Sequence, residues 1–163
     1  KSKLYLPVLI ALIFFSFNTP KTNIIHSNVV AHVLIDNYHN DLYAEVYFKK
    51  DLFTMALLQE ESCAPENMVK VCGNSYAQQH INMTLNDEPL TFENQSVNIE
   101  KDYVIYRYFL GSSNGKIQKI EVESDYMLKY DDHSVTKLRI KIDELEKHYS
   151  LKAERKKITL ALN

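Results

Sequence analysis

Two carboxylates and an imidazole stand side by side in the segment Tyr130-Asp131-Asp132-His133, between two predicted strands. Carboxylate oxygens bind hard cations such as Ca²⁺, and a carboxylate beside an imidazole can also do acid–base chemistry. In a solvated turn, the same Asp side chains bond their own backbone. Asp131, Asp132 and His133 therefore have two interpretations: the metal or acid–base site of a small hydrolase, and a polar turn, which is the simpler one.

No other segment carries a recognisable catalytic motif. The sequence lacks a Gly-x-Ser-x-Gly elbow, a phosphate-binding Walker loop and a His-Glu-x-x-His helix. The segment 111–115 (Gly-Ser-Ser-Asn-Gly) is followed by a predicted strand, so it reads as a turn and not as a phosphate loop. We therefore predict no catalytic residue and no cofactor, and a non-enzymatic domain is favoured over an enzyme.

A group of aromatic and basic side chains alternates with the predicted core positions of two strands. Tyr and Arg in exposed positions are typical of the residues that dominate protein interfaces. The strand propensity of Tyr explains the same residues without any partner. The candidate interaction surface consists of Tyr43, Tyr47, Tyr103 and Arg107.

The stretch from Leu42 to Leu58 changes its hydrophobic period from two to about three and a half, which predicts a strand that leads directly into a helix. Asp51 stands where an N-cap is expected. The helix, predicted to run to Glu61, is apolar nearly all round, so we expect it to be buried.

Alternating apolar residues predict strands along most of the remaining chain. We expect a hairpin of residues 29–35 with 42–48, and a second hairpin of residues 103–110 with 117–122, in which Val104, Tyr106, Tyr108 and Leu110 face the core. Segment 143–157 has helical composition but also contains a candidate short strand at 149–151, and both readings stay open. The predicted fold is mainly β (α+β): an antiparallel β-sandwich of about seven or eight strands with a helical insertion after the second strand.

Composition limits the class of partner. The chain has 163 residues, of which 45% are hydrophobic and 25% charged, as in one globular domain. Lys1, Lys3 and Lys21 precede residue 28 and every acidic residue follows it, so residues 28–163 hold 16 basic and 21 acidic residues. This acidic balance predicts no nucleic-acid partner.

Residues 1–27 read as a signal peptide or an uncleaved signal anchor. Lysines precede an apolar run of 14 residues, Leu4 to Phe17, which is short of the roughly 20 needed to span a bilayer. We therefore predict export to the periplasm or cell envelope for a single domain of residues 28–163, with membrane contact only through an uncleaved N-terminal segment. In an oxidising compartment Cys63 and Cys72, nine positions apart, are expected to form a disulfide.

The ordered motifs resemble a family of small exported bacterial proteins, domain-of-unknown-function family 6702. The likeness rests on Phe48-x-x-Asp51-Leu52 with Ala56-Leu57, which is similar to the strand-to-helix signature of that family, and it continues through His80-Ile81-x-Met83-x-Leu85-Asn86, Leu90-x-Phe92 and Glu100-x-Asp102. The resemblance implies export, a β-rich fold and a strand near Tyr149, and it implies no activity. The chain departs from the family pattern in reading Lys50-Asp51 before the helical leucine and Asp132-His133-Ser134-Val135 in the later loop.

Three functions follow as hypotheses. The first is an exported accessory or protein-interaction domain at the cell envelope, without catalysis. The second is a metal-dependent or acid–base hydrolase that uses Asp131, Asp132 and His133. The third is a carrier that holds a small ligand between the sheet and the helix of residues 51–61.

Overall fold

A computed structural model describes residues 28–60, 68–113 and 115–162. Its elements in chain order are β1 (Val29–Tyr38), β2 (Asp41–Lys49), α1 (Lys50–Leu58), the π-helical segment η2 (Met68–Gly73), α2 (Asn74–Gln79), β3 (Ile81–Leu85), β4 (Glu88–Pro89), β5 (Glu93–Ile99), β6 (Tyr103–Ser112), β7 (Lys119–Ser124), β8 (Val135–Ile142), β9 (Leu145–Leu151) and β10 (Lys157–Ala161). The predicted N-terminal signal segment, residues 1–27, lies outside the described residues. No helix of the described part is long and apolar enough to cross a membrane.

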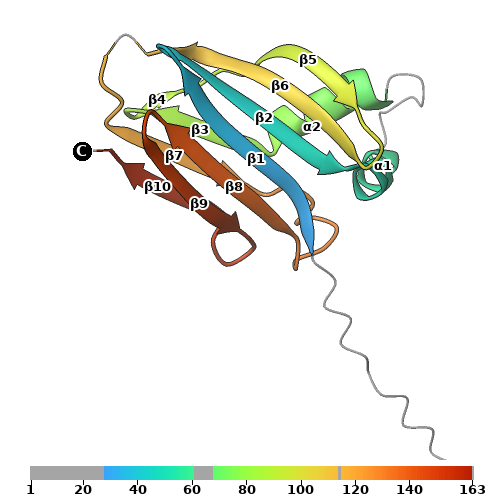
Figure 1. Cartoon of the computed structure of the whole chain (residues 1–163). Coiled ribbons are helices and arrows are strands. Elements are labelled where there is room, and N and C mark those ends of the chain that lie inside the picture. Colours follow the sequence, from blue (N-terminus) through green and yellow to red (C-terminus); the bar gives the residue numbers. More distant parts are fainter. Residues whose placement is uncertain (1–27, 61–67, 114, 163) are drawn as a thin grey trace, which may run out of the picture.

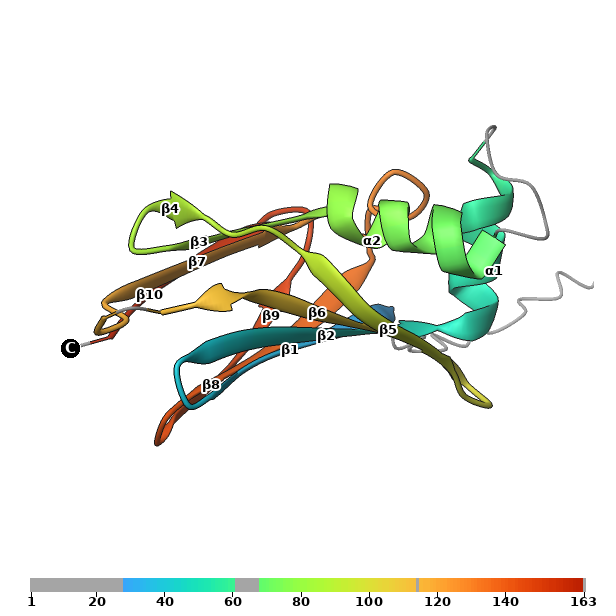
Figure 2. The same cartoon turned by 90° about the horizontal axis from the view of Figure 1, so that it is seen from above.

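The strands form two sheets, which confirms a mainly β, α+β fold with helices after the second strand (Figure 1). The first sheet has six strands in the order β5-β6-β2-β1-β8-β9, and the second has four in the order β10-β7-β3-β4. Figure 2 shows the sheets as two layers, with the helices continuing the layer of the four-stranded sheet beyond its end. The described residues thus form ten strands, more than the seven or eight predicted.

Among the strands of the described residues, one neighbouring pair is parallel and not antiparallel as predicted. β8 lies along the free edge of β1 in parallel, from Val29 beside Val135 to Asp36 beside Lys141. The chain leaves the first sheet after β6, forms β7 in the second sheet, and returns through residues 125–134. β8 thereby runs in the same direction as β1. Two strands joined by a tight hairpin turn are always antiparallel, so a parallel neighbour has to come from a distant part of the chain.

The transition from β2 to α1 occurs as predicted, but two details are wrong. The helix begins at Lys50, so Asp51 lies in its first turn and makes no capping bond. The helix buries Phe53 and Leu57, whereas Met55 and Leu58 are 59% and 63% exposed. Because α1 lies at the end of the six-stranded sheet, only one of its sides meets the core.

The predicted hairpin of residues 103–110 with 117–122 is also wrong. β6 pairs with β2 and β5, whereas β7 pairs with β3 and β10 in the other sheet. β6 already has a partner along each of its edges, so the segment after Ser112 crosses between the layers. The predicted inward register of β6 is confirmed, because Val104, Tyr106, Tyr108 and Leu110 are all buried.

Segment 143–157 forms no helix, and its residues Leu145–Leu151 form strand β9. The β8–β9 connection is a tight turn in which Asp143 adopts a positive φ of 52°. Asn37 of β1 holds this turn, since its side chain accepts from the Asp143 backbone N–H at 2.8 Å and donates to the Asp143 carboxylate at 2.7 Å. Pairing of Leu145–Leu151 with Thr136–Ile142 of β8 outweighs the helical propensity of the segment.

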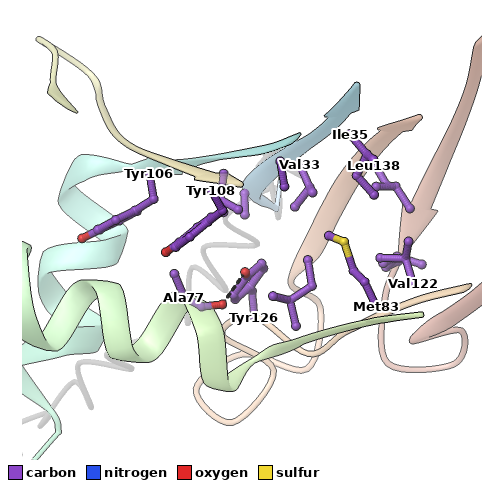
Figure 3. Close-up of a cluster of buried hydrophobic side chains, with 14 of the residues drawn as sticks. Val33, Ile35, Ala77, Met83, Tyr106, Tyr108, Val122, Tyr126 and Leu138 are labelled. Atoms are coloured by element: carbon purple, nitrogen blue, oxygen red, sulfur yellow. Dashed lines mark hydrogen bonds between the residues drawn. The ribbon is translucent and has the colours of Figure 1, made fainter. Parts of the chain in front are cut away.

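Buried tyrosines connect the sheet to the helices (Figure 3). The Tyr106 hydroxyl donates to the Val69 carbonyl at 2.6 Å, and the Tyr126 hydroxyl donates to the Ala77 carbonyl at 2.6 Å. Tyr108 donates to the Asn74 side chain at 3.0 Å. Each ring fills the core while its hydroxyl satisfies a polar group of η2 or α2, so the helices are held in register with the strands.

Candidate binding groove

The six-stranded sheet turns one face to the core and the other to solvent. On the outer face, the strand register aligns side chains in rows that run across the strands. One row crosses four strands through Tyr47, His32, Lys137 and Ser150. The next row passes through Arg107, Glu45, Leu34, Arg139 and His148. Strand alternation therefore gathers side chains from distant parts of the sequence onto one surface.

A depression of about 740 Å³ lies across this face, and we call it the outer groove. Its lining includes His32, Tyr47, Tyr103, Lys137, Ser150 and Arg155. None of its twelve lining residues is acidic, and five are Lys, Arg or His. In a protein with more acidic than basic residues, this composition marks the groove as a local site of positive charge.

The cations of the outer face differ in their partners. Arg139 pairs with Glu146 at 2.9 Å, and the nearest approach of Lys141 to Asp36 is 3.9 Å. Lys137 instead donates to the Ser150 hydroxyl at 2.8 Å. The Arg155 guanidinium donates to the Ser150 carbonyl at 3.2 Å.

Lys137 and Arg155 therefore converge on the same residue of β9. Within residues 28–60, 68–113 and 115–162, neither of them forms an ion pair with an acidic side chain. Arg155 reaches the groove because the Lys152 and Arg155 backbones pair across a short turn after β9.

Burial and the neighbouring cations both affect the protonation of His32. Burial lowers the pKa of its imidazole below the ordinary value of 6.5, and the cations Lys49 and Lys137 lower it further. The His32 and Tyr103 rings meet edge to face, with centroids 6.4 Å apart. The neutral imidazole thus forms part of an aromatic wall beside the cations.

The predicted interaction residues all lie on this outer face. Arg107 stands over the Tyr43 ring, 5.3 Å from its centroid, and its Nε is 3.7 Å from a Glu45 oxygen. The Tyr47 hydroxyl donates to the other Glu45 oxygen at 2.6 Å. Burial and this bonded carboxylate raise the pKa of Tyr47 to about 12.

A second depression, of about 430 Å³, continues the same face beyond Leu34. It is lined by side chains of both charges, with Asp36 and Glu45 among them as well as Arg107 and Lys141. The two depressions share Leu34. The outer face thus has a positive end and a mixed-charge end.

Asp131, Asp132 and His133 come together in the loop after β7, with ligand atoms within 4.8 Å of one another. All three side chains are exposed, and no residue of the loop lines either depression. The Asp131 carboxylate accepts from the His133 backbone N–H at 2.9 Å, and the Asp132 carboxylate lies 2.6 Å from the His133 ring. These contacts fit the solvated-turn interpretation, and the hydrolase hypothesis lacks a fourth converging group among the described residues.

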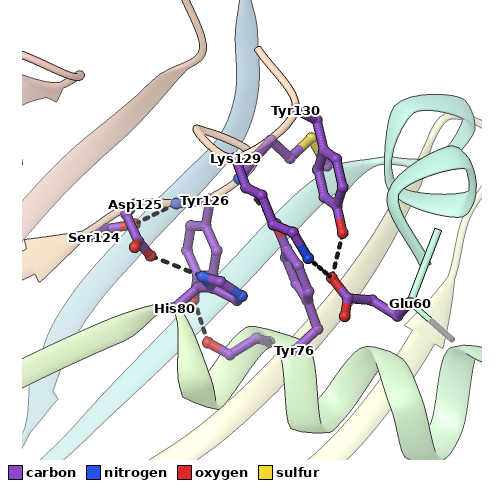
Figure 4. Close-up of polar contacts among 10 residues, drawn as sticks. Glu60, Tyr76, His80, Ser124, Asp125, Tyr126, Lys129 and Tyr130 are labelled. Atoms are coloured by element: carbon purple, nitrogen blue, oxygen red, sulfur yellow. Dashed lines mark hydrogen bonds and ion pairs between the residues drawn. The ribbon is translucent and has the colours of Figure 1, made fainter. Parts of the chain in front are cut away.

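A second polar cluster lies between α2 and the loop after β7 (Figure 4). The His80 Nδ1 is 2.8 Å from the Asp125 carboxylate, and the adjacent Ser124 suggests a catalytic triad at first sight. Ser124, however, is 2% exposed, and its hydroxyl accepts from the Tyr126 backbone N–H at 3.5 Å. The cluster therefore joins elements of the fold and holds no accessible nucleophile.

The Glu60 side chain binds the same region from the end of α1. Its carboxylate accepts from the Tyr130 hydroxyl and lies 3.6 Å from Lys129 (Figure 4). The hydrogen bond from Tyr130 is the main reason why the pKa of Glu60 is lowered.

Two further predictions concern α1 and the two cysteines. No residue of α1 lines the outer groove or the second depression, and the carrier hypothesis stays a prediction. Cys63 lies outside the described residues, and the Cys63–Cys72 disulfide stays a prediction.

Sequence reasoning missed the basic end of the groove. In the sequence, Lys137, Arg139 and Lys141 alternate with apolar residues, and by itself this pattern indicates only that one face of β8 is exposed to solvent. Placing those residues beside His32 and Tyr47 required the parallel pairing of β1 with β8, for which the sequence carries no local signal.

Neither a scan against protein-family models nor a search of curated proteins finds a match for this chain. The likeness to domain-of-unknown-function family 6702 stays a prediction.

Proposed function

We propose that this chain is a non-catalytic binding domain whose outer groove and adjoining tyrosine face bind a protein partner. The observation that carries the proposal is the groove itself: an open depression of about 740 Å³ with aromatic and basic walls and no acidic lining residue. Tyr and Arg are enriched among the residues that dominate protein interfaces.

The same side chains are held in place before a partner arrives. Glu45 fixes both the Tyr47 hydroxyl and Arg107, and Arg107 in turn covers the Tyr43 ring. A surface that is already ordered loses less side-chain entropy on binding, which favours affinity.

The proposed place of action is outside the cytoplasm, at the cell envelope. Support comes from the sequence alone, through the basic residues and apolar run at positions 1–17 and the two cysteines. Fractionation of the producing cells tests this part, because an export substrate is recovered in the envelope or periplasmic fraction and a chain found only in the cytosol contradicts it.

The binding proposal is tested with the double variant Tyr43→Ser/Tyr47→Ser. Complexes are crosslinked in the producing cells, purified through a tag on the full chain, and compared with those of the wild type. The control variant Glu123→Ser/Thr159→Ser changes the outer face of the four-stranded sheet. We expect the tyrosine variant to lose a stoichiometric partner that the control retains. A tyrosine variant that folds normally and keeps every complex of the wild type contradicts the proposal.

A further inference from the structure

We infer that the Lys137–Arg155 end of the outer groove is a subsite for the carboxylates of an acidic segment in the partner protein. The inference rests on the proposed function and deepens it, since it names the chemistry of the bound segment. It starts from the two cations of the groove that have no acidic partner among the described residues.

The first step is the distribution of counter-charges. On the outer face, Glu146 neutralises Arg139 and Asp36 lies near Lys141. Lys137 and Arg155 have only the hydroxyl and the carbonyl of Ser150. These two oxygens orient the cations without cancelling their charge, so a carboxylate that enters the groove gains charge-assisted hydrogen bonds at modest desolvation cost.

The second step is the aromatic wall beside the cations. Tyr47 and Tyr103 line the same groove, with ring centroids 6.5 Å apart in an edge-to-face arrangement, and His32 meets Tyr103. These rings offer apolar surface to an aromatic or aliphatic side chain of the same segment. The groove therefore fits a segment that carries acidic and apolar residues close together.

The third step is the reason why the groove fits a protein segment better than a polyanion such as a nucleic acid. The second depression continues the face past Leu34, and there the carboxylates of Asp36 and Glu45 stand among the cations Arg107 and Lys141. A uniformly charged strand that lies along the whole face therefore finds no continuous positive surface at this end. A peptide can place its acidic residues at one end and neutral or basic residues at the other.

The test is a selection of random eight-residue peptides on the purified full chain, followed by affinity measurement with the enriched peptides. We expect them to be richer in Asp and Glu than the library. Replacing their acidic residues by Asn and Gln is expected to weaken binding about tenfold or more, which corresponds to the loss of one charge-assisted hydrogen bond.

The matched variants carry the same change of net charge. Lys137→Gln/Arg155→Gln is expected to weaken binding about tenfold or more, whereas Lys147→Gln/Lys156→Gln, outside the groove lining, is expected to change it less than about twofold. All four side chains are exposed, so both variants are expected to fold.

Several results overturn the inference. It is wrong if the selection is empty, if the enriched peptides have no acidic excess, or if the two charge variants bind them with equal affinity. It is also wrong if a twelve-residue oligothymidine binds more tightly than any peptide. The proposed function is judged separately. If the Tyr43→Ser/Tyr47→Ser variant loses its partner while the peptides show no acidic preference, the binding face stands and only the acidic subsite is wrong.

Discussion

Gly73 lies where the helical segment packs closely against Tyr106 of the six-stranded sheet. A Cβ atom at this position would overlap the hydroxyl of Tyr106 and lie 3.1 Å from the Phe53 ring. The Tyr106 hydroxyl is fixed by its 2.6 Å bond to the Val69 carbonyl, and the tyrosine is fully buried. The absence of a side chain at residue 73 is therefore required by packing and not by the backbone conformation.

Gly73→Ala is expected to lower the free energy of unfolding by about 1–3 kcal/mol, as overpacking in a filled core does. Thermal or urea unfolding measures the change. Gly115→Ala serves as the control, because a Cβ there meets nothing within 4 Å, and it is expected to change stability by less than about 0.5 kcal/mol. In a Tyr106→Phe background, which removes the clashing oxygen, the cost of Gly73→Ala is expected to fall. Equal costs in both backgrounds contradict this account of the site.

His32 reports the electrostatics of the outer groove. Its pKa is lowered in the folded protein, so between pH 6.5 and that lower value the unfolded chain binds more protons than the native state. Above pH 6.5 the residue is neutral in both states and contributes no pH dependence. As the pH falls through this window, the free energy of unfolding therefore decreases.

His32→Gln is expected to remove this part of the pH dependence, which urea unfolding at a series of pH values measures. Titration of the His32 ring by NMR tests the cause. Lys137→Met is expected to bring the pKa of His32 closer to 6.5, whereas Lys147→Met leaves it unchanged. A His32 pKa at or above 6.5 in the wild type would show that the groove is not a site of positive potential.

Asn86 connects two parts of the four-stranded sheet, the turn between β3 and β4 and the start of β7. It adopts a positive φ of 50° in the tight turn between β3 and β4. Its side-chain oxygen accepts from the backbone N–H groups of Gln118 and Lys119 at 2.8 and 3.0 Å, at the start of β7. One side chain thus sets the turn and fastens it to the neighbouring strand.

Asn86→Ala is expected to cost about 1–3 kcal/mol, since it removes the side-chain hydrogen bonds to Gln118, Lys119 and Lys116, and Ala tolerates the left-handed conformation less well than Asn. Asn86→Gly keeps the turn conformation and loses only the side-chain bonds, so its cost is expected to be smaller. Hydrogen exchange of the Gln118 and Lys119 amides is expected to accelerate in both variants. Unchanged exchange at these amides would show that Asn86 does not hold β7.

The local hydrophobic pattern was sufficient to predict several helices and strands. It failed to predict the burial and pairing of elements whose partners lie far away in the sequence. The period change at Leu42–Leu58 predicted the passage from β2 to α1. The same pattern overstated the burial of α1, because the side that carries Met55 and Leu58 has no part of the sheet beneath it. β9 shows the opposite error, since pairing with β8 outweighs its helical composition.

At the scale of the whole molecule, the crossings between the two sheets were the feature that the sequence did not predict. Residues 111–115 have the composition of a hairpin turn, yet β6, which ends at Ser112, and β7, which begins at Lys119, belong to different sheets. The candidate site depended on the same topology. Alternation predicted that Tyr47 and Arg107 share a surface, but the basic side of the groove exists only because β8 returns beside β1.

The most direct measurement of the central claim is site-specific photo-crosslinking in the cells that produce the protein. A photoreactive phenylalanine analogue replaces Tyr103 at the outer groove in one variant and Glu123, on the outer face of the other sheet, in the control. We expect a single protein to be crosslinked from position 103 and none from position 123. Crosslinks of equal yield from both positions, or none from position 103, would contradict the assignment of the outer groove as the binding site.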